Sequence, residues 1–227
     1  MRGGEDRERD SCAGAGPVLR LRAAVDSSAA GVSAAYTRAH PEEASDEALM
    51  IAYRDGDSHA FQALYARHRG GLYRFLLRQC GTAAIAEELF QDVWLNLIRA
   101  RLRYTPEARF ATYLYRIAHN RLIDHFRRAS HRPSLASDDA DDDPIAVLAA
   151  DRRDEPDIRM ESKAQVERFM ALLADLPDAQ REAFVMHEEA GLSVEEIARA
   201  TGVNAETAKS RLRYAVAKLR RGLQELM

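Results

Sequence analysis

Polar side chains near the C-terminus are spaced as in a helix that reads double-stranded DNA. Those along the predicted last helix are Glu206, Lys209, Ser210, Arg211, Arg213 and Tyr214. Lysine, arginine and serine near the start of a helix can hydrogen-bond to base edges and phosphates in the major groove. The alternative is a helical hairpin whose charged face is only solvated. We favour the DNA-reading interpretation because these side-chain types agree with the turn and the helix ends described below.

A second group of residues mixes aromatic rings with arginine and asparagine. Its members are Tyr113, Tyr115, Arg116, Asn120, Arg127 and Arg128. Unpaired bases stack on aromatic rings and hydrogen-bond to polar side chains, while cations hold the nucleic-acid backbone. The pattern predicts a surface for unpaired nucleic acid. The alternative is that both tyrosines only pack in the core or at the rim of a small helical bundle.

An exposed leucine predicts a docking site for a partner helix. In the helix expected at 83–100, most apolar residues share one side, but Leu95 projects on the other. Its neighbours there are Glu88, Gln91 and Asp92. A large apolar side chain framed by acids and amides suits a protein interface. A single exposed leucine also occurs on many soluble proteins without any such role.

The histidines of the chain do not form a catalytic or metal-binding pattern. His187 is followed by Glu188 and Glu189 but lacks the second histidine of an HExxH motif. His119 and His125 are six residues apart and do not share a helical face. A glycine-rich phosphate loop is also missing. We therefore expect no enzyme activity, no metal and no cofactor.

The elements that must position these groups are predicted to be helices. Apolar residues recur at spacings of three and four from Ser45 onward, with a break at 55–57 and further helices at 83–100 and 107–128. No alternating run of β-branched residues indicates a strand. The expected all-α architecture is a flexible tail (1–43), a helical domain (44–128), a flexible acidic linker (129–158) and a second helical domain (159–227).

The second domain has the sequence pattern of a helix-turn-helix. Gly191 is expected to end one helix, and Ser193 with Glu196 three residues later forms a capping box at the start of the next. A turn at 201–203 then precedes Asn204, which is expected to cap the longer last helix. Two capped helices joined by a short glycine-containing turn are typical of this motif.

Charge is segregated along the chain although the net charge is only −3. Residues 99–132 contain nine arginines and two acids, whereas residues 133–157 contain nine acids and two arginines. This segregation indicates a basic working surface beside an acidic connector.

Hydropathy and cysteine content restrict the cellular location. The longest stretch without a charged residue, 27–37, is about half the length of a membrane span. Cys12 and Cys80 form neither a CxxC pair nor a disulfide framework. We expect a cytoplasmic protein without a membrane span or a secretory signal.

Taken together, these motifs resemble the extracytoplasmic function (ECF) sigma factors, a compact branch of the sigma-70 family. The resemblance runs from about Ser45 to Leu223. Four passages carry it: DEALMIAYRDGDSHAFQALYARH, AEELFQDVW, FATYLYRIAHNRLIDHFRR and LPDAQREAFVMHEEAGLSVEEIARATGVNAETAKSRLRYAVAKLR. Their combination and order are specific to the family, whereas a helix-turn-helix alone fits many regulators.

The resemblance implies a division of labour between the two domains. The passage around Leu95 would dock on the β′ clamp helices of core RNA polymerase, together with Glu88, Gln91 and Asp92. The passage 113–128 would open and read the minus-ten promoter element. The second helix of the helix-turn-helix would read the minus-thirty-five element as duplex. An anti-sigma factor is a further partner that the family allows. The rival interpretation is a helix-turn-helix regulator that binds duplex DNA but never binds polymerase.

Overall fold

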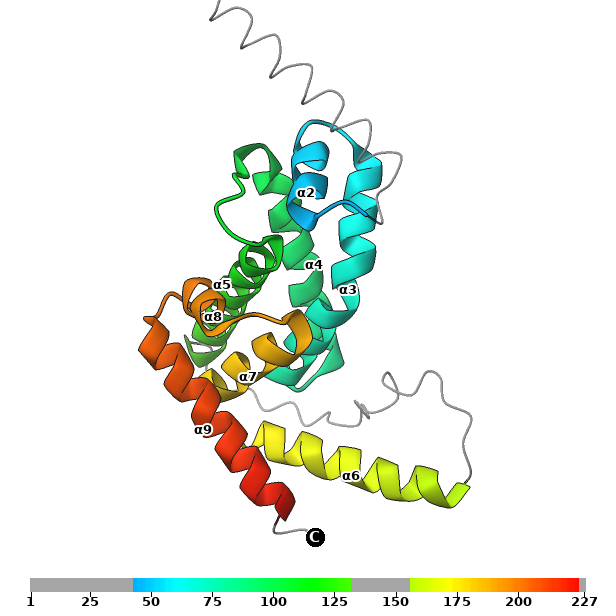
Figure 1. Cartoon of the computed structure of the whole chain (residues 1–227), viewed down its shortest axis with the longest axis vertical. Coiled ribbons are helices and arrows are strands. Elements are labelled where there is room, and N and C mark those ends of the chain that lie inside the picture. The colour runs from blue at the N-terminus through cyan, green and yellow to red at the C-terminus, as the bar shows by residue number, and fades with distance from the viewer. Residues whose placement is uncertain (1–42, 132–155, 225–227) are drawn as a thin grey trace, which may run out of the picture.

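The computed structural model describes residues 43–131 and 156–224, and within these ranges it contains helices and no strand (Figure 1). The all-α prediction is therefore confirmed. The elements are α2 (Asp46–Arg54), α3 (Ser58–Cys80), α4 (Ala83–Ala100), the 3-10 turn η1 (Arg101–Arg103), α5 (Phe110–His131), α6 (Pro156–Ala174), α7 (Asp178–Ala190), α8 (Val194–Thr201) and α9 (Ala205–Gln224). Among the described helices, none combines the length and the apolar composition that a bilayer span requires.

The break between α2 and α3 falls where the sequence predicts it. Asp57 caps α3 with its side chain, which accepts a hydrogen bond from the His59 N–H at 3.0 Å. Gly56 before it has a φ of 108°, a backbone conformation that glycine adopts without strain. The start of α2 is capped in the same way, because the Ser45 hydroxyl accepts from the Ala48 N–H.

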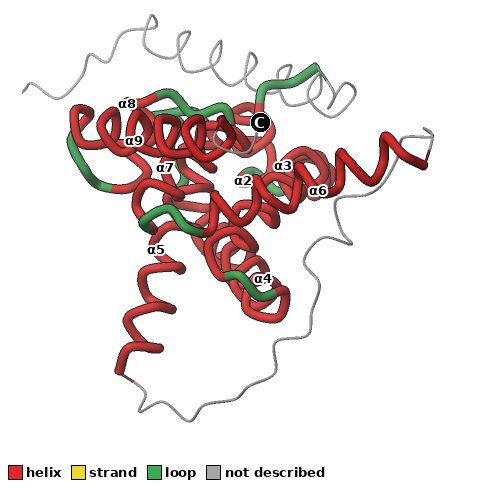
Figure 2. Tube along the Cα trace, turned by 90° about the horizontal axis from the view of Figure 1, so that it is seen from below, coloured by secondary structure: helices red, strands yellow, loops and turns green. Residues whose placement is uncertain are grey.

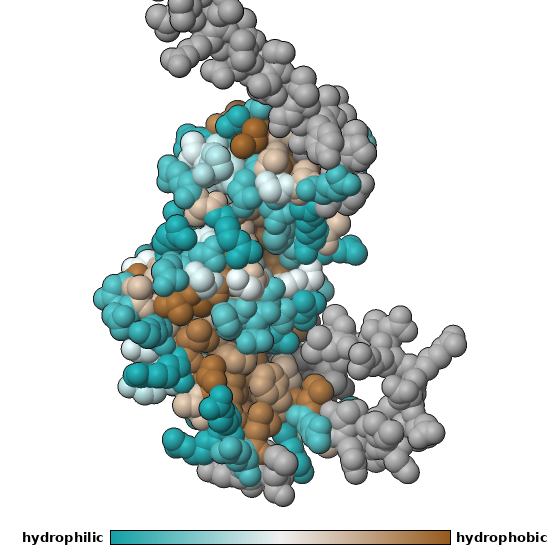
Figure 3. Space-filling view, in the orientation of Figure 1, coloured by the Kyte–Doolittle hydropathy of each residue, from teal (hydrophilic) through white to brown (hydrophobic). Residues whose placement is uncertain are grey.

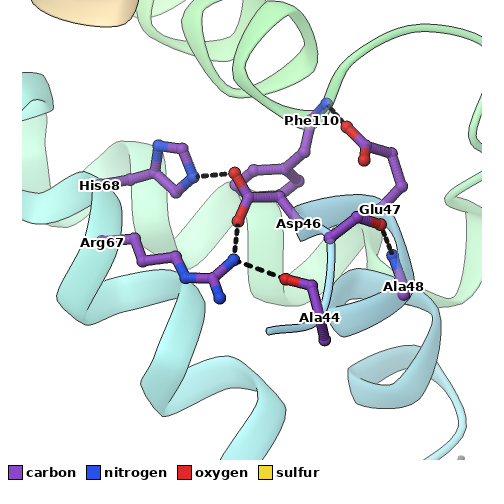
Figure 4. Close-up of polar contacts among 8 residues, drawn as sticks. Ala44, Asp46, Glu47, Ala48, Arg67, His68 and Phe110 are labelled. Atoms are coloured by element: carbon purple, nitrogen blue, oxygen red, sulfur yellow. Dashed lines mark hydrogen bonds and ion pairs between the residues drawn. The ribbon is translucent and has the colours of Figure 1, made fainter. Parts of the chain in front are cut away.

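A half-buried carboxylate, that of Asp46, ties α2 to α3 (Figure 4). Asp46 accepts hydrogen bonds from Arg67 at 2.6 Å and pairs with the His68 ring at 2.7 Å. Burial raises the pKa of Asp46, but the hydrogen bonds from His68 and Arg67 outweigh it, so that the pKa is lowered overall. The carboxylate therefore stays ionised at neutral pH and holds the two helices together.

Helix α5 begins later than the sequence predicts. Its first residue is Phe110 instead of Glu107, because the Glu107 N–H bonds to the Thr105 carbonyl in a turn. The Phe110 N–H donates to the Glu47 carboxylate of α2 at 2.7 Å, which caps the new helix start (Figure 4). At its other end α5 continues to His131, and its C-terminal half projects away from the other helices (Figure 2).

The expected linker overlaps with helices at both of its ends. Residues 129–131 belong to α5 and residues 156–158 belong to α6. The rest of the linker and the tail up to residue 42 lie outside the described residues.

The N-terminal helices enclose one apolar core. Fully buried members on four different helices are Leu49, Leu72, Phe75, Leu97, Phe110 and Leu114. An aromatic cluster joins α3 to α4, where the Phe61 and Trp94 rings meet edge to face with centroids 5.7 Å apart. Because α4 packs on both α3 and α5, its outer face is held at a fixed angle to the surface of α5.

Helices α8 and α9 form the predicted helix-turn-helix, and α7 precedes it. Gly191 ends α7 in the left-handed region with a φ of 59°. The capping box is present, since the Ser193 hydroxyl accepts from the Glu196 N–H and the Glu196 carboxylate accepts from the Ser193 N–H at 2.9 Å. Helix α6 lies against α9, and apolar residues gather on the surface where α6, α7 and α9 meet (Figure 3).

Removing the capping hydroxyl of α8 should destabilise the C-terminal helices. We expect Ser193→Ala to lower the free energy of unfolding by about 1 kcal/mol, because the Glu196 N–H loses its acceptor. Urea denaturation followed by circular dichroism would measure the change. Thr82→Ala is the matched control, since Thr82 precedes α4 without a side-chain capping bond. Equal losses in both variants would contradict the assignment.

The two groups of helices pack directly on each other. Helix α7 lies against α3, and α8 lies against α5 (Figure 1). The sequence predicts two modules on a tether and contains no sign of this contact. The N-terminal and C-terminal helices therefore form one packed unit, and the polar surfaces of both groups lie on it.

Candidate nucleic-acid and partner-binding surfaces

Helix α9 presents a polar face that begins at its first turn. Asn204 caps the helix by accepting a hydrogen bond from the Thr207 N–H at 2.7 Å. On the opposite side Ala208, Ala215 and Leu219 are buried, which confirms the predicted core face. The cap and the buried face together fix the rotation of the helix, so its polar side points away from the domain core.

The predicted DNA-reading residues of α9 differ in exposure. Glu206, Lys209, Arg213 and Tyr214 are exposed, whereas Ser210 and Arg211 are half-buried. The Arg213 guanidinium lies over the Tyr214 ring at 5.0 Å from its centroid, which orients both side chains. Lys209 and Glu206 are 3.8 Å apart, an exposed pair that contributes little stability. These side chains are free to exchange such contacts for phosphates and base edges.

The exposed side of α5 brings Arg116, Asn120, Arg127 and Arg128 to the surface. The Arg116 guanidinium lies over the Tyr113 ring at 5.6 Å. Tyr113 itself is half-buried and packs its ring edge to face on Tyr104, with centroids 5.2 Å apart. Burial raises the pKa of Tyr113, so its hydroxyl keeps its proton and remains a hydrogen-bond donor. Asp124 holds Arg127 at 3.4 Å and Arg121 at 3.7 Å.

Tyr115 does not belong to this surface, contrary to the sequence-based expectation. It is 1% exposed and packs on Phe75 with ring centroids 5.1 Å apart. Burial raises the pKa of its hydroxyl well above the usual range. Of the two neighbouring tyrosines, only Tyr113 can therefore reach a nucleic-acid base.

An open hollow between α4 and α5 extends the surface around Asn120. Its volume is about 340 Å³, and its lining residues are Asn96, Arg99, Ala100, Arg103, Tyr113, Ile117, Asn120 and Arg121. The sequence analysis did not identify the three arginines of this lining as binding residues. The signal was present, because Arg99, Arg103 and Arg121 contribute to the basic balance of residues 99–132. The hollow combines amide groups, an aromatic ring and cations, which is the chemistry that unpaired nucleotides require.

A second hollow adjoins the first and includes a residue from the C-terminal helices. Arg103, Thr112, Tyr113 and Arg116 line it from one side, and Arg199 of α8 lines it from the other. The volume is about 270 Å³. The pKa of Tyr104, which also lines this hollow, rises to about 12 because burial disfavours the phenolate. Its hydroxyl therefore remains neutral.

The outer face of α4 carries the predicted protein-docking residues. Leu95 is 45% exposed, Glu88 and Gln91 are exposed, and Asp92 is half-buried. Val93 and Trp94 on the opposite face are buried in the core. Leu95 therefore stands on a rigid support as an apolar side chain without a covering element from the described residues.

The described residues contain no group of three or more histidine, cysteine, aspartate or glutamate side chains that could hold a metal ion. Two of the histidines considered above have protein partners instead. His119 pairs with Glu182 at 2.6 Å, and the His187 ring contacts the Leu192 carbonyl at 2.9 Å.

Two family models match the chain. The sigma-70 region 2 model covers residues 64–132, which include α4, η1 and α5. The sigma-70 region 4 model covers residues 167–219, which include α7, α8 and most of α9. The α4 face, the α5 surface and the first hollow lie within the region 2 match, the polar face of α9 lies within the region 4 match, and the second hollow has lining residues from both.

Curated relatives are similar over most of their length. RNA polymerase sigma factor CarQ of Myxococcus xanthus is 34% identical over 177 residues, which are 78% of this chain and 97% of the relative. ECF RNA polymerase sigma factor SigM of Mycobacterium tuberculosis is 33% identical over 182 residues, which are 79% of this chain and 85% of the relative.

Solved structures share the fold. CnrH in complex with the cytosolic domain of CnrY matches with a TM-score of 0.57 and 22% identity, covering 79% of this chain and 97% of that chain. Sigma factor RpoE from Bartonella quintana, in complex with the anti-sigma factor NepR, matches with a TM-score of 0.55 and 20% identity, covering 72% of this chain and 96% of that chain.

Proposed function

The chain belongs to the ECF branch of the sigma-70 family, and from this premise we propose how its surfaces share the work of starting transcription. A sigma factor directs RNA polymerase to promoters. A duplex-binding regulator that never meets polymerase is not favoured, because it leaves the region 2 match unexplained. We divide the chain into a polymerase-binding and minus-ten-reading domain (44–128), a linker (129–158) and a minus-thirty-five-reading domain (159–227).

The proposal for the minus-ten element is carried by the surface of α5. Asn120 and Tyr113 line the open hollow, and Arg116 stacks on Tyr113 beside it. Bases that have left the duplex can stack on the ring and hydrogen-bond to the amide, while Arg127 and Arg128 hold the strand backbone. Duplex DNA offers no free base faces, so this surface binds the separated strand.

The proposal for the minus-thirty-five element is carried by the exposed start of α9. Lys209 and Arg213 project from the helix next to Glu206, Ser210, Arg211 and Tyr214. A helix inserted into the major groove places such side chains against base edges. The element is therefore read as intact duplex.

We assign core polymerase binding to the outer face of α4. Leu95 would insert into the β′ clamp helices, and Glu88, Gln91 and Asp92 would form the polar rim around it. An interface of this kind takes most of its energy from a central apolar anchor.

Three further assignments follow from the same role. Bond formation belongs to polymerase, so we propose that this chain is not an enzyme. It works in the cytoplasm, where its polymerase partner is. An anti-sigma factor is a proposed regulator, by analogy with NepR bound to RpoE in the solved structure.

Run-off transcription tests the proposed function as a whole. Purified chain would be added to core polymerase with a pool of genomic promoter fragments, and RNA products would be sequenced at their 5′ ends. We expect start sites that share one pair of upstream motifs and that disappear without the chain. Binding to duplex fragments without RNA synthesis or co-elution with polymerase would support the rival regulator.

Substitutions on α9 should weaken recognition of the upstream element. We expect Lys209→Ala and Arg213→Ala to reduce binding to minus-thirty-five duplex while leaving opening of a bound promoter intact. If Arg213 contacts a phosphate, the salt dependence of binding should fall by about one unit of slope; if it contacts a base, about 1–3 kcal/mol should be lost at one position. Fluorescence anisotropy at several salt concentrations separates the two cases. Unchanged binding in both variants would contradict the assignment.

A further inference from the structure

The second hollow carries an excess of positive charge. Three exposed arginines line it, Arg103 of η1, Arg116 of α5 and Arg199 of α8. Among the described lining residues only Glu107 is acidic, and its carboxylate accepts a hydrogen bond from the Thr105 hydroxyl at 3.2 Å. Guanidinium groups that surround one small space are suited to hold a phosphate, because phosphate oxygens accept paired hydrogen bonds from them.

Two buried hydroxyl groups of the lining lack a hydrogen-bond partner. Thr112 and Tyr104 are each 3% exposed, and neither the Thr112 Oγ1 atom nor the Tyr104 hydroxyl has a partner among the described residues. Most buried hydroxyls in folded proteins are hydrogen-bonded, so an unpartnered one calls for an explanation. A polar ligand in the hollow would supply the missing partner.

The dipole of α5 adds to the attraction for an anion. Thr112 lies in the first turn of this helix, which begins at Phe110. The positive end of a helix dipole attracts negative charge, and the effect is largest within the first turn. The arginines, the hydroxyls and the helix end therefore favour the same kind of group, an anion with several oxygen atoms.

An aromatic platform lies beside the cations. The Arg116 guanidinium lies over the ring of the half-buried Tyr113, 5.6 Å from its centroid. Planar bases stack both on aromatic rings and on guanidinium planes. The hollow has a volume of about 270 Å³, close to the lower end of the range for small-molecule sites, about 300–1,000 Å³. Such a volume suits one nucleotide and not a longer strand.

We propose that the second hollow binds a free mononucleotide. The phosphate lies among Arg103, Arg116 and Arg199, and the base stacks on the pair formed by Arg116 and Tyr113. Arg199 belongs to the region 4 match, whereas the helices assigned to the minus-ten strand belong to the region 2 match. The arginine from α8 therefore distinguishes this site from the first hollow around Asn120.

Under the proposed function, on which this step rests, the nucleotide competes with the minus-ten strand. Arg103 and Tyr113 line both hollows, so these side chains cannot serve both ligands at once. Bound nucleotide lowers the affinity of the chain for the separated strand, and by reciprocity the strand lowers the affinity for the nucleotide. Promoter use then depends on the concentration of that nucleotide.

Calorimetric titration of the full chain tests the site without polymerase or promoter. The probes are AMP, GMP, CMP and UMP, and the controls are the four nucleosides and inorganic phosphate. We expect at least one nucleotide to bind about tenfold more tightly than its nucleoside and than phosphate, because only the nucleotide uses both the cations and the aromatic platform. Absence of binding by all four nucleotides, or equal binding of nucleotide and phosphate, would overturn the site.

Substitutions in the lining separate a ligand site from a structural role. Arg199→Ala should weaken nucleotide binding about tenfold, because a charge-assisted contact to the phosphate is lost. Thr112→Val should also weaken it while leaving the free chain at least as stable, because the deleted hydroxyl has no partner there. Arg69→Ala removes an exposed arginine of α3 and should bind nucleotide like the parent chain. Unchanged binding in both Arg199→Ala and Thr112→Val would show that the nucleotide does not occupy this hollow.

A competition experiment tests the regulatory step apart from the binding step. The chain would be bound to a fluorescent single strand that carries the minus-ten sequence of a promoter identified by run-off transcription. We expect the nucleotide to displace this strand from the parent chain and to do so about tenfold less effectively from Arg199→Ala. Binding of nucleotide without displacement of the strand would overturn the competition. A chain that starts no transcription would instead refute the proposed function, and the calorimetric result does not depend on it.

Discussion

Leu95→Arg is expected to reduce the affinity of the chain for core RNA polymerase by about 30-fold. Leu95 is 45% exposed on α4, and its backbone is held in place by the buried Val93 and Trp94. If its side chain fills an apolar pocket on the partner, arginine loses that burial and places an unpaired charge at the centre of the interface. Loss of a central anchor typically costs 2 kcal/mol or more, which corresponds to the stated factor. Fluorescence titration of labelled chain with core polymerase measures it.

Two controls make the result specific. Ala84→Arg adds the same charge to the same helix at another exposed position, and it should leave the affinity within about twofold. Leu95→Met keeps an apolar side chain of similar volume and should retain most of the affinity. If Leu95→Arg binds polymerase like the parent chain and supports normal RNA synthesis, the docking face must lie elsewhere.

Helix positions that depend on neighbouring residues could be predicted from the sequence. Helix α4 begins and ends as expected, and the caps at Ser193 and Asn204 form the predicted hydrogen bonds. In both of these caps the donor and the acceptor are three residues apart. The start of α5 could not be predicted in this way, because the Phe110 N–H finds its acceptor in Glu47, which is 63 residues away in sequence.

The two tyrosines of α5 show where the sequence was informative but was not fully used. Tyr115 follows Leu114 and precedes Ala118 by three residues, so the helical period already places it on the predicted core face. Tyr113 lies at the edge of that face and remains half-buried. The shared residue type suggests equal roles for Tyr113 and Tyr115, but the helical periodicity places only Tyr115 within the core face.

The contact between the two domains could not be predicted from a single sequence. The seven-residue spacing of Glu182, Glu189 and Glu196 is visible, but a row of acids is usually a solvated face. Its partners are Arg74 and Arg78 of α3, Arg109 just before α5, and His119 within α5, and only the folded chain brings these side chains to one side. The same holds for the hollow around Asn120, whose arginines come from α4, η1 and α5.

Asn120→Ala is expected to reduce promoter opening about tenfold while leaving upstream duplex binding intact. The Asn120 amide is exposed at the hollow and has both a donor and an acceptor, which suits the edge of an unpaired base. A tenfold smaller population of open promoter corresponds to a loss of about 1.4 kcal/mol of binding free energy, which is the expected cost of removing these hydrogen bonds. A 2-aminopurine base in the minus-ten element reports strand separation, and anisotropy on a minus-thirty-five duplex reports upstream binding.

A pre-melted promoter separates opening from base reading by Asn120. If the amide only traps bases as the strands part, a template with mismatched minus-ten strands should restore normal RNA synthesis to Asn120→Ala. If the amide also reads a particular base, the variant should remain weaker than the parent chain on that template and should tolerate substitutions at one position. Gln62→Ala removes an exposed amide from α3 and should behave like the parent chain on every template. Equal loss of duplex binding and opening in Asn120→Ala would place this residue outside the proposed minus-ten surface.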